Sequence, residues 1–153
     1  MGKSHQVGWN EKGTAAANAR RELPPLVSRY FALVRELLAK SPSPPELHRL
    51  RLATKRLRYT LELFQPCYGP GLETRMAGLR ELQQLLGEVN DSAATGRLLD
   101  RAMPKSAQRT RVAAFLEARA ADQARKFRKH WDEVFDAPGR EHWWTAYLER
   151  QAH

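Results

Sequence analysis

The sequence has little of several features that define whole classes of protein. It holds one cysteine, Cys67, in 153 residues, which excludes an internal disulfide and favours a reducing compartment. No stretch approaches the roughly 18 uncharged apolar residues that a membrane helix needs. Residues 1–21 are polar and alanine-rich, so we expect no secretory signal and a cytoplasmic protein. The length and the apolar fraction of 42% predict a single globular domain.

Acidic residues are also scarce relative to basic ones. Lys and Arg number 26 against 17 Asp and Glu, which gives a net charge of +9 and a pI of about 10.2. Nineteen of the cations are arginine and seven are lysine. The planar fork of arginine suits bidentate contact with phosphate or carboxylate oxygens. The composition therefore predicts an anionic partner, with phosphate-rich polymers ahead of acidic proteins.

Period-2 alternation of β-branched residues is missing, and Leu, Ala, Arg and Glu dominate most of the chain. We expect residues 1–14 to be a flexible leader and residues 15–153 to form one helical domain. The fold class predicted is all-α: an antiparallel bundle of about four long helices plus a short terminal helix. The helical patterns cover residues 25–40, 44–65, 72–86, 92–103 and 106–135, followed by an aromatic segment with Trp143, Trp144 and Tyr147.

Two helix starts are indicated by proline. Ser43, Pro44 and Glu46 have the pattern of an N-cap, a proline in the first turn and a capping box, so a helix is expected to start there. Pro24 and Pro25 place the start of the preceding helix near residue 25, because proline belongs in the first turn. A short helix before residue 25 is compatible with this pattern.

A break is expected in the middle of the chain. Gly87 has the character of a C-terminal stop after the helix over residues 72–86. Asn90 and Asp91 then supply an N-cap for a new helix, because their side-chain oxygens satisfy amides of the first turn. We therefore expect this pair to be structural, since an acid would repel a polyanion.

The densest run of cations lies in the helix expected over residues 44–65. Five Lys and Arg residues and no acid occur between positions 47 and 61. At about 100° per residue, His48, Arg51, Lys55 and Arg58 fall within an arc of about 80°, separate from the apolar face. Solvated helix faces usually place acids four residues from bases, and here only Glu62 can pair, with Arg58. The pattern favours an anion site over a solvated face.

The helix expected over residues 106–135 repeats this pattern more weakly. Arg119, Lys126, Lys129 and His130 share one arc of the helix, but two acids share it too. Two interpretations stay open: a second basic wall, or a surface on which salt bridges neutralise the cations.

Motifs for catalysis and metal binding are missing. The glycines lack Walker and dinucleotide spacing, and no two of the five histidines have the i,i+4 spacing with a carboxylate that helical zinc sites use. Cys67 has no adjacent histidine that would activate it. We expect a non-catalytic protein without metal or cofactor, in which His48 donates a hydrogen bond to phosphate.

Two spaced blocks carry a resemblance to a known family. They are His48-x-x-Arg51-x-x-x-Lys55-Arg56-x-Arg58-Tyr59 with Glu62-Leu63-Phe64, and Leu85-Leu86-Gly87-x-x-Asn90-Asp91. Over residues 26–131 the chain resembles the CHAD family, the conserved histidine α-helical domain. The resemblance implies a helical domain that binds inorganic polyphosphate through basic residues and is often joined to a triphosphate-tunnel domain.

The resemblance assigns polyphosphate binding to two groups of residues: His48, Arg51, Lys55, Arg56 and Arg58 on the motif helix, and Arg119, Lys126, Lys129 and His130 on the later one. CHAD domains usually hold two related halves, whereas this sequence carries one copy of the motif, which resembles the second half. We therefore expect a homodimer, with the aromatic tail as a candidate interface. The same resemblance implies a protein associated with polyphosphate granules.

Two other functions would use the same features. A nucleic-acid-binding protein could use the basic residues, so weak nucleic-acid binding is a second expected partner interaction. Base stacking needs aromatic side chains among the cations, however, and only Tyr59 accompanies them. A helical scaffold for protein partners is the other alternative, favoured if the cations pair with acids elsewhere in the fold.

Overall fold

The computed structural model describes residues 8–153, and every regular element among them is helical. This confirms the predicted all-α bundle of four long helices and a short terminal helix. Two short turns, η1 at Gln65–Cys67 and η2 at Trp131–Phe135, link the α-helices. The five α-helices are α1 Ala15–Leu38, α2 Pro44–Leu63, α3 Pro70–Ala102, α4 Ala107–His130 and α5 Arg140–Arg150.

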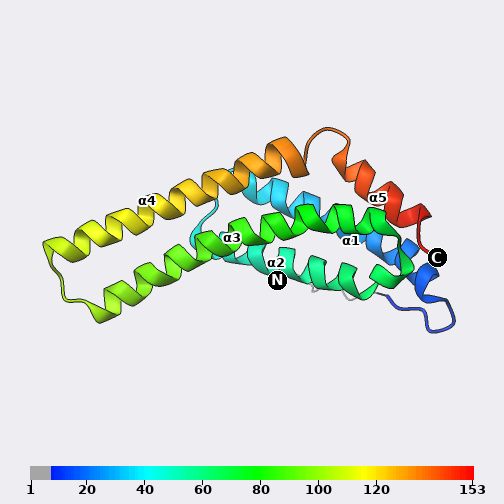
Figure 1. The fold of residues 1–153 in the computed structure, drawn as a ribbon, viewed down its shortest axis with the longest axis horizontal. Coiled ribbons are helices and arrows are strands. Elements are labelled where there is room, and N and C mark those ends of the chain that lie inside the picture. The colour runs from blue at the N-terminus through cyan, green and yellow to red at the C-terminus, as the bar shows by residue number, and fades with distance from the viewer. Residues whose placement is uncertain (1–7) are drawn as a thin grey trace.

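The longest helices form a projecting hairpin. α3 and α4 pack along each other and extend beyond the ends of the other helices (Figure 1). α2 packs between α1 and α3, and α5 returns along α1. Among residues 8–153, none of the helices combines the length and the apolar character of a membrane-crossing segment.

A cluster of aromatic rings organises the core. Trp131 and Phe135 of the π-helical turn η2 stack with their ring centroids 5.1 Å apart, and both rings contact Phe31 of α1. Trp144 of α5 joins this cluster through Phe135. The aromatic tail therefore completes the chain's own core, and Trp144 is not available for the dimer interface for which it was a candidate.

The first helix starts well before the proline pair. α1 begins at Ala15 and runs through Pro24 and Pro25, so the expected start near residue 25 is wrong. Buried side chains continue along one face on both sides of the prolines, with Leu23 before them and Val27 after them. Packing of this face outweighs the loss of about 3 kcal/mol that a proline inside a helix brings.

Residues 8–14 pack against α1. The amide of Asn10 donates a 2.7 Å hydrogen bond to the side chain of Asn18, and the amide of Gly8 donates to Glu22. The ring of Trp9 lies 5.9 Å from that of Phe64, measured between centroids. This part of the expected leader therefore contacts the bundle, while residues 1–7 lie outside the described residues.

The third helix has no break at Gly87. α3 is one helix of 33 residues with Asn90 and Asp91 in its interior, so the predicted stop and the predicted N-cap are both wrong. Ser92 donates a 2.9 Å hydrogen bond to Gln123 of α4, and both side chains are buried. Packing against α4 keeps the helix continuous through a glycine that costs about 1 kcal/mol relative to alanine.

Arg75 of α3 holds α5 in place. Its guanidinium lies 3.7 Å from the ring centroid of Trp143 and 4.1 Å from that of Tyr147, and it donates a 2.8 Å hydrogen bond to the carbonyl oxygen of Trp143. Burial lowers the pKa of Arg75. Gly71, one turn earlier, leaves room for the Tyr147 ring, because a Cβ at Gly71 would overlap that ring.

Replacing Gly71 by alanine should therefore destabilise the fold by displacing Tyr147 from Arg75. We expect Gly71→Ala to lower the free energy of unfolding by about 1–3 kcal/mol in chemical denaturation. Gly96→Ala in the same helix is the matched control, since a Cβ there meets no atom within 4 Å. It should raise stability by about 0.5–1 kcal/mol. Equal losses in the two variants would show that the Tyr147 contact is not the cause.

Candidate anion-binding site

The buried side of α2 determines which of its residues face outward. Leu50, Leu57 and Leu61 lie in the core, with Thr54 among them. Thr54 donates a 2.8 Å hydrogen bond to the Leu50 carbonyl oxygen, so its hydroxyl oxygen accepts from the Tyr30 hydroxyl at 2.7 Å. Burial raises the pKa of Tyr30, which keeps this hydroxyl protonated as a donor. These contacts fix the rotation of α2 about its axis.

The start of α2 is fixed by the predicted capping box. The Ser43 hydroxyl accepts a hydrogen bond from the Glu46 amide, and the Glu46 carboxylate accepts one from the Ser43 amide at 3.1 Å. These bonds lower the pKa of Glu46. The capping box is therefore confirmed. It holds the carboxylate of Glu46, the first acid of α2, at the start of the helix and away from the cations that follow.

The predicted row of cations follows one flank of α2. We call His48, Arg51, Lys55 and Arg58 the α2 stripe; His48 is exposed and the other three are half-buried. Arg58 donates a 2.9 Å hydrogen bond to Glu62. Within residues 8–153 no carboxylate forms an ion pair with the other three. The cations Arg51 and Lys55 are thus free to bind an external anion, and His48 can donate a hydrogen bond to it.

Tyr59 lies between two cations of the stripe. The guanidinium carbon of Arg58 lies 4.6 Å from the Tyr59 ring centroid, and the Lys55 amine lies 5.7 Å from it. Such cation–π contacts contribute about 0.5–1 kcal/mol at exposed sites. The tyrosine ring therefore helps to hold both cations on the same flank.

One end of the α2 stripe lies close to α3. A hydrogen bond to Glu73 raises the pKa of Arg80 on α3, and the charge of Glu62 raises it further. Glu62, the ion-pair partner of Arg58, is therefore close enough to Arg80 of α3 for their charges to interact. Gln65 of η1, which follows α2, donates a 2.9 Å hydrogen bond to Glu73 of α3 and so also joins this end of α2 to α3.

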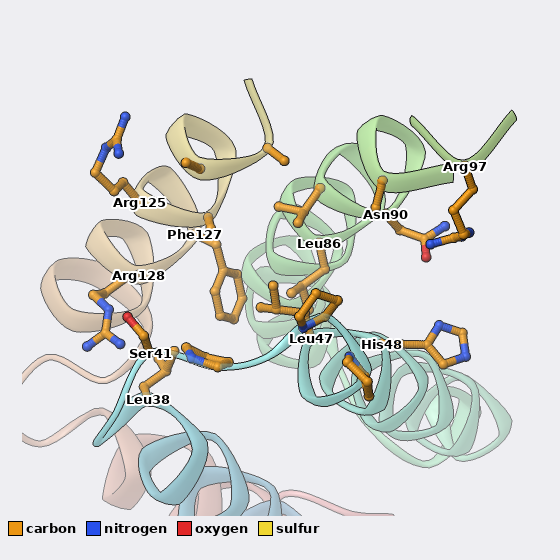
Figure 2. Close-up of a pocket in the computed structure, with 18 residues that line it drawn as sticks. Leu38, Ser41, Leu47, His48, Leu86, Asn90, Arg97, Arg125, Phe127 and Arg128 are labelled. Atoms are coloured by element: carbon orange, nitrogen blue, oxygen red, sulfur yellow. The ribbon is translucent and has the colours of Figure 1, made fainter. Parts of the chain in front are cut away.

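The other end of the stripe also meets α3. His48 lines a cavity together with Asn90 and Arg97 of α3, and Figure 2 shows these three side chains on the same side of it. Steps of three and four residues connect Asn90 through Gly87 and Gln83 back to Arg80, so these residues share one face of α3. We call the contact line between this face and the α2 stripe the α2–α3 seam.

Two features of the seam are relevant to ligand binding: open space at Gly87 and two polar atoms without hydrogen-bond partners within residues 8–153. A Cβ at Gly87 would meet no atom within 4 Å, so the seam is open there. The Nε of Arg58 and the Oε1 of Gln83 are buried without a hydrogen-bond partner among the described residues. Buried polar atoms are nearly always satisfied in native proteins, so each of these two atoms has hydrogen-bonding capacity that the described residues leave unused.

The remaining predicted residues lie elsewhere. Arg56 is exposed about 160° around α2 from Arg58, and thus on the opposite flank. The four predicted residues of α4 do not line the cavity that His48 shares with α3 and α4. Lys126 pairs with Asp122 at 3.4 Å, and His130 is half-buried with its Nε2 unpartnered. The structure does not bring Arg119, Lys126, Lys129 or His130 together with the α2 stripe.

Three arginines near the site were missed from the sequence. Arg80 and Arg97 lie on α3, and Arg128 lies on α4 where it lines the cavity. Arg80 and Arg97 share one face of α3, and their spacing in steps of three and four residues is visible in the sequence once Gly87 is treated as helical. The expected break at Gly87 hid that signal.

Comparison with protein families identifies the fold. The family model of the CHAD domain matches residues 4–100, more than half of the chain. The chain belongs to the CHAD family. The CHAD match contains the α2 stripe and nearly all of α3, but it ends before α4, whereas the resemblance was expected to reach residue 131. No curated protein and no solved structure matches this chain.

Replacing Thr54 by valine tests how α2 is held. The buried Tyr30 hydroxyl then loses its acceptor, so we expect the free energy of unfolding in urea to fall by about 1–3 kcal/mol. Tyr30→Phe should cost less, because Thr54 keeps its bond to Leu50. The double variant should be more stable than Thr54→Val alone, since no unpaired hydroxyl remains. Strictly additive losses would show that the two hydroxyls are not coupled.

Proposed function

We propose that the α2–α3 seam binds inorganic polyphosphate without catalysing a reaction. Membership of the CHAD family supports this, because CHAD domains are known in polyphosphate-related proteins. The observation that carries the proposal is the pair of unpaired cations Arg51 and Lys55, with His48 as a hydrogen-bond donor at the end of the same row. Like charges in a row repel one another, and a bound polyanion removes that repulsion.

The dimensions of the stripe suit an extended ligand. His48 and Arg58 are ten residues apart on α2, which corresponds to about 15 Å along the helix axis. A linear polyanion can therefore contact several cations at once. Arg51 can bind phosphate oxygens in a bidentate manner, and Lys55 adds a point charge one turn further on.

Arg80 and Arg97 extend this cationic track on the α3 side. Arg80 is engaged by Glu73, whereas Arg97 is exposed and forms no ion pair within residues 8–153. Arg97 and His48 lie on the same side of the cavity at this end of the seam (Figure 2). A polyphosphate chain that extends past His48 can therefore contact Arg97. We expect the protein to bind this ligand in the cytoplasm or at a polyphosphate granule.

Nucleic acid remains the competing polyanion. Binding of single strands relies on aromatic platforms for the bases, each worth about 1–3 kcal/mol. Tyr59 is the aromatic residue on the stripe, and Arg58 and Lys55 already lie over its ring. A chain of phosphates needs no such platform, so the stripe fits polyphosphate better than DNA or RNA.

Replacing Arg51 by alanine should weaken polyphosphate binding about tenfold or more, because a charge-assisted hydrogen bond contributes about 1.5–3 kcal/mol. Arg56→Ala is the matched control: the same change in the same helix, on the opposite flank. Its affinity should stay within about twofold of the parent, and parental affinity should fall steeply with added salt.

Fluorescence anisotropy with labelled polyphosphate, and with single-stranded DNA and RNA of equal charge, measures these affinities. Equal losses for Arg51→Ala and Arg56→Ala would contradict a site on the seam. Tighter binding of DNA or RNA than of polyphosphate would favour the nucleic-acid alternative.

We also propose that the chain forms a homodimer through the α3–α4 hairpin. This hairpin projects from the bundle (Figure 1) and carries Leu98 and Phe115, which are 62% and 63% exposed.

Light scattering should give twice the 17.5 kDa monomer mass. A double variant with Leu98→Ser and Phe115→Ser should give the monomer mass. Leu63→Ser, outside the hairpin, should remain dimeric. A parent chain that stays monomeric at tens of micromolar would contradict this proposal.

A further inference from the structure

A cavity of about 630 Å³ lies where four helices meet. It is placed at the base of the α3–α4 hairpin, where α1 ends and α2 begins, and residues from all four helices line it. Cavities of about 300–1,000 Å³ suit small molecules, whereas a protein partner typically covers about 800 Å² of surface. The volume therefore fits a small molecule.

The floor of this cavity is apolar. Leu86 and Phe127 are buried beneath it, and Figure 2 shows them between its two sides. Ala120, Ala121 and Ala124 of α4 line it as well, and their small side chains leave the space open. Such a floor binds the hydrocarbon part of a ligand by excluding water from it.

The rim of the cavity is cationic. His48 and Arg97 lie on one side, Arg125 and Arg128 lie on the other, and no acid is among the described lining residues. Two acids near the rim, Asp122 and Glu46, are engaged by other residues. The Oδ1 atom of Asp122 lies 3.5 Å from Nη2 of Arg125. The Glu46 carboxylate takes part in the capping box, and its Oε2 lies 3.6 Å from Nζ of Lys40.

Arg128 is the best positioned of these cations. It is half-buried, and its Nη2 donates a 3.0 Å hydrogen bond to the carbonyl oxygen of Lys40. The guanidinium lies beside Ser41 in Figure 2. This bond leaves further N–H donors free while it restrains the side chain, so less conformational entropy is lost when an anion binds.

We propose that the cavity binds a single-chain amphiphilic anion. Its alkyl chain lies over Leu86 and Phe127, and its carboxylate or phosphate headgroup binds Arg128 and the Ser41 hydroxyl. The proposal does not rest on polyphosphate binding: His48 is the stripe residue that also lines the cavity, whereas Arg51, Lys55 and Arg58 do not line it and the headgroup binds Arg128 and Ser41 instead.

Calorimetric titration of the full chain with dodecanoate, below the concentration at which it forms micelles, tests the proposal. One dodecanoate should bind per chain. Decanoate should bind about fifteenfold more weakly, because each methylene changes affinity about fourfold. Dodecanol lacks the charge and should bind at least about tenfold more weakly. Dodecyl phosphate distinguishes the two headgroups, and inorganic phosphate alone should not displace dodecanoate.

Substitutions in the floor and at the rim locate the site. Ala124→Leu fills the floor and should lower dodecanoate affinity about tenfold or more. Ala118→Leu makes the same change at an exposed position of α4 outside the cavity and should leave affinity unchanged. Arg128→Gln should weaken dodecanoate but not dodecanol. Circular dichroism confirms that each variant is folded.

Dodecanoate binding that is equal in the parent and in Ala124→Leu would overturn the proposal, as would several weak sites in place of one. Arg51→Ala separates the two functions, since it should reduce polyphosphate affinity and leave dodecanoate affinity intact. Loss of polyphosphate binding alone would therefore contradict only the seam, and loss of dodecanoate binding alone would contradict only the cavity.

Discussion

The fixed rotation of α2 is the constraint on which the candidate site depends. Three leucines and the Thr54–Tyr30 hydrogen bond commit one side of the helix to the core. The charged flank then has to face outward along α3. A turn of about 100°, equal to one residue, would bury Arg51 among apolar side chains, where an unpaired charge costs several kcal/mol. Core packing and cation display are therefore one property of the same helix.

The continuity of α3 links the two binding regions. Because the helix does not stop at Gly87, its face from Arg80 to Arg97 runs along the α2 stripe and ends at the cavity. His48 and Arg97 lie at the junction of the two. An extended polyanion uses cations spaced along the seam, whereas an amphiphile uses an apolar floor beside Arg128. The two proposed ligands thus use different cations, Arg51 and Lys55 in the seam and Arg128 at the cavity, and they differ in how much apolar surface they bring.

Local signals explain what could be predicted from the sequence. The capping box at Ser43 and the α2 stripe depend on contacts within one helix, so spacing alone is sufficient for them. Pro24, Pro25 and Gly87 carry strong local signals for a break, but buried neighbours outweigh them. Arg128 reaches the cavity only through the packing of α4 on α3, which no local pattern specifies.

Arginine side-chain NMR, with polyphosphate added to the folded chain, tests the central claim most directly. The Nε–Hε signals of Arg51 and Arg58 should shift first and saturate together, with Arg97 following at the end of the seam. The signals of Arg56 and Arg119, which lie on other faces, should change little. Shifts that centre on Arg119 and leave Arg51 unchanged would contradict the assignment of the site to the α2–α3 seam.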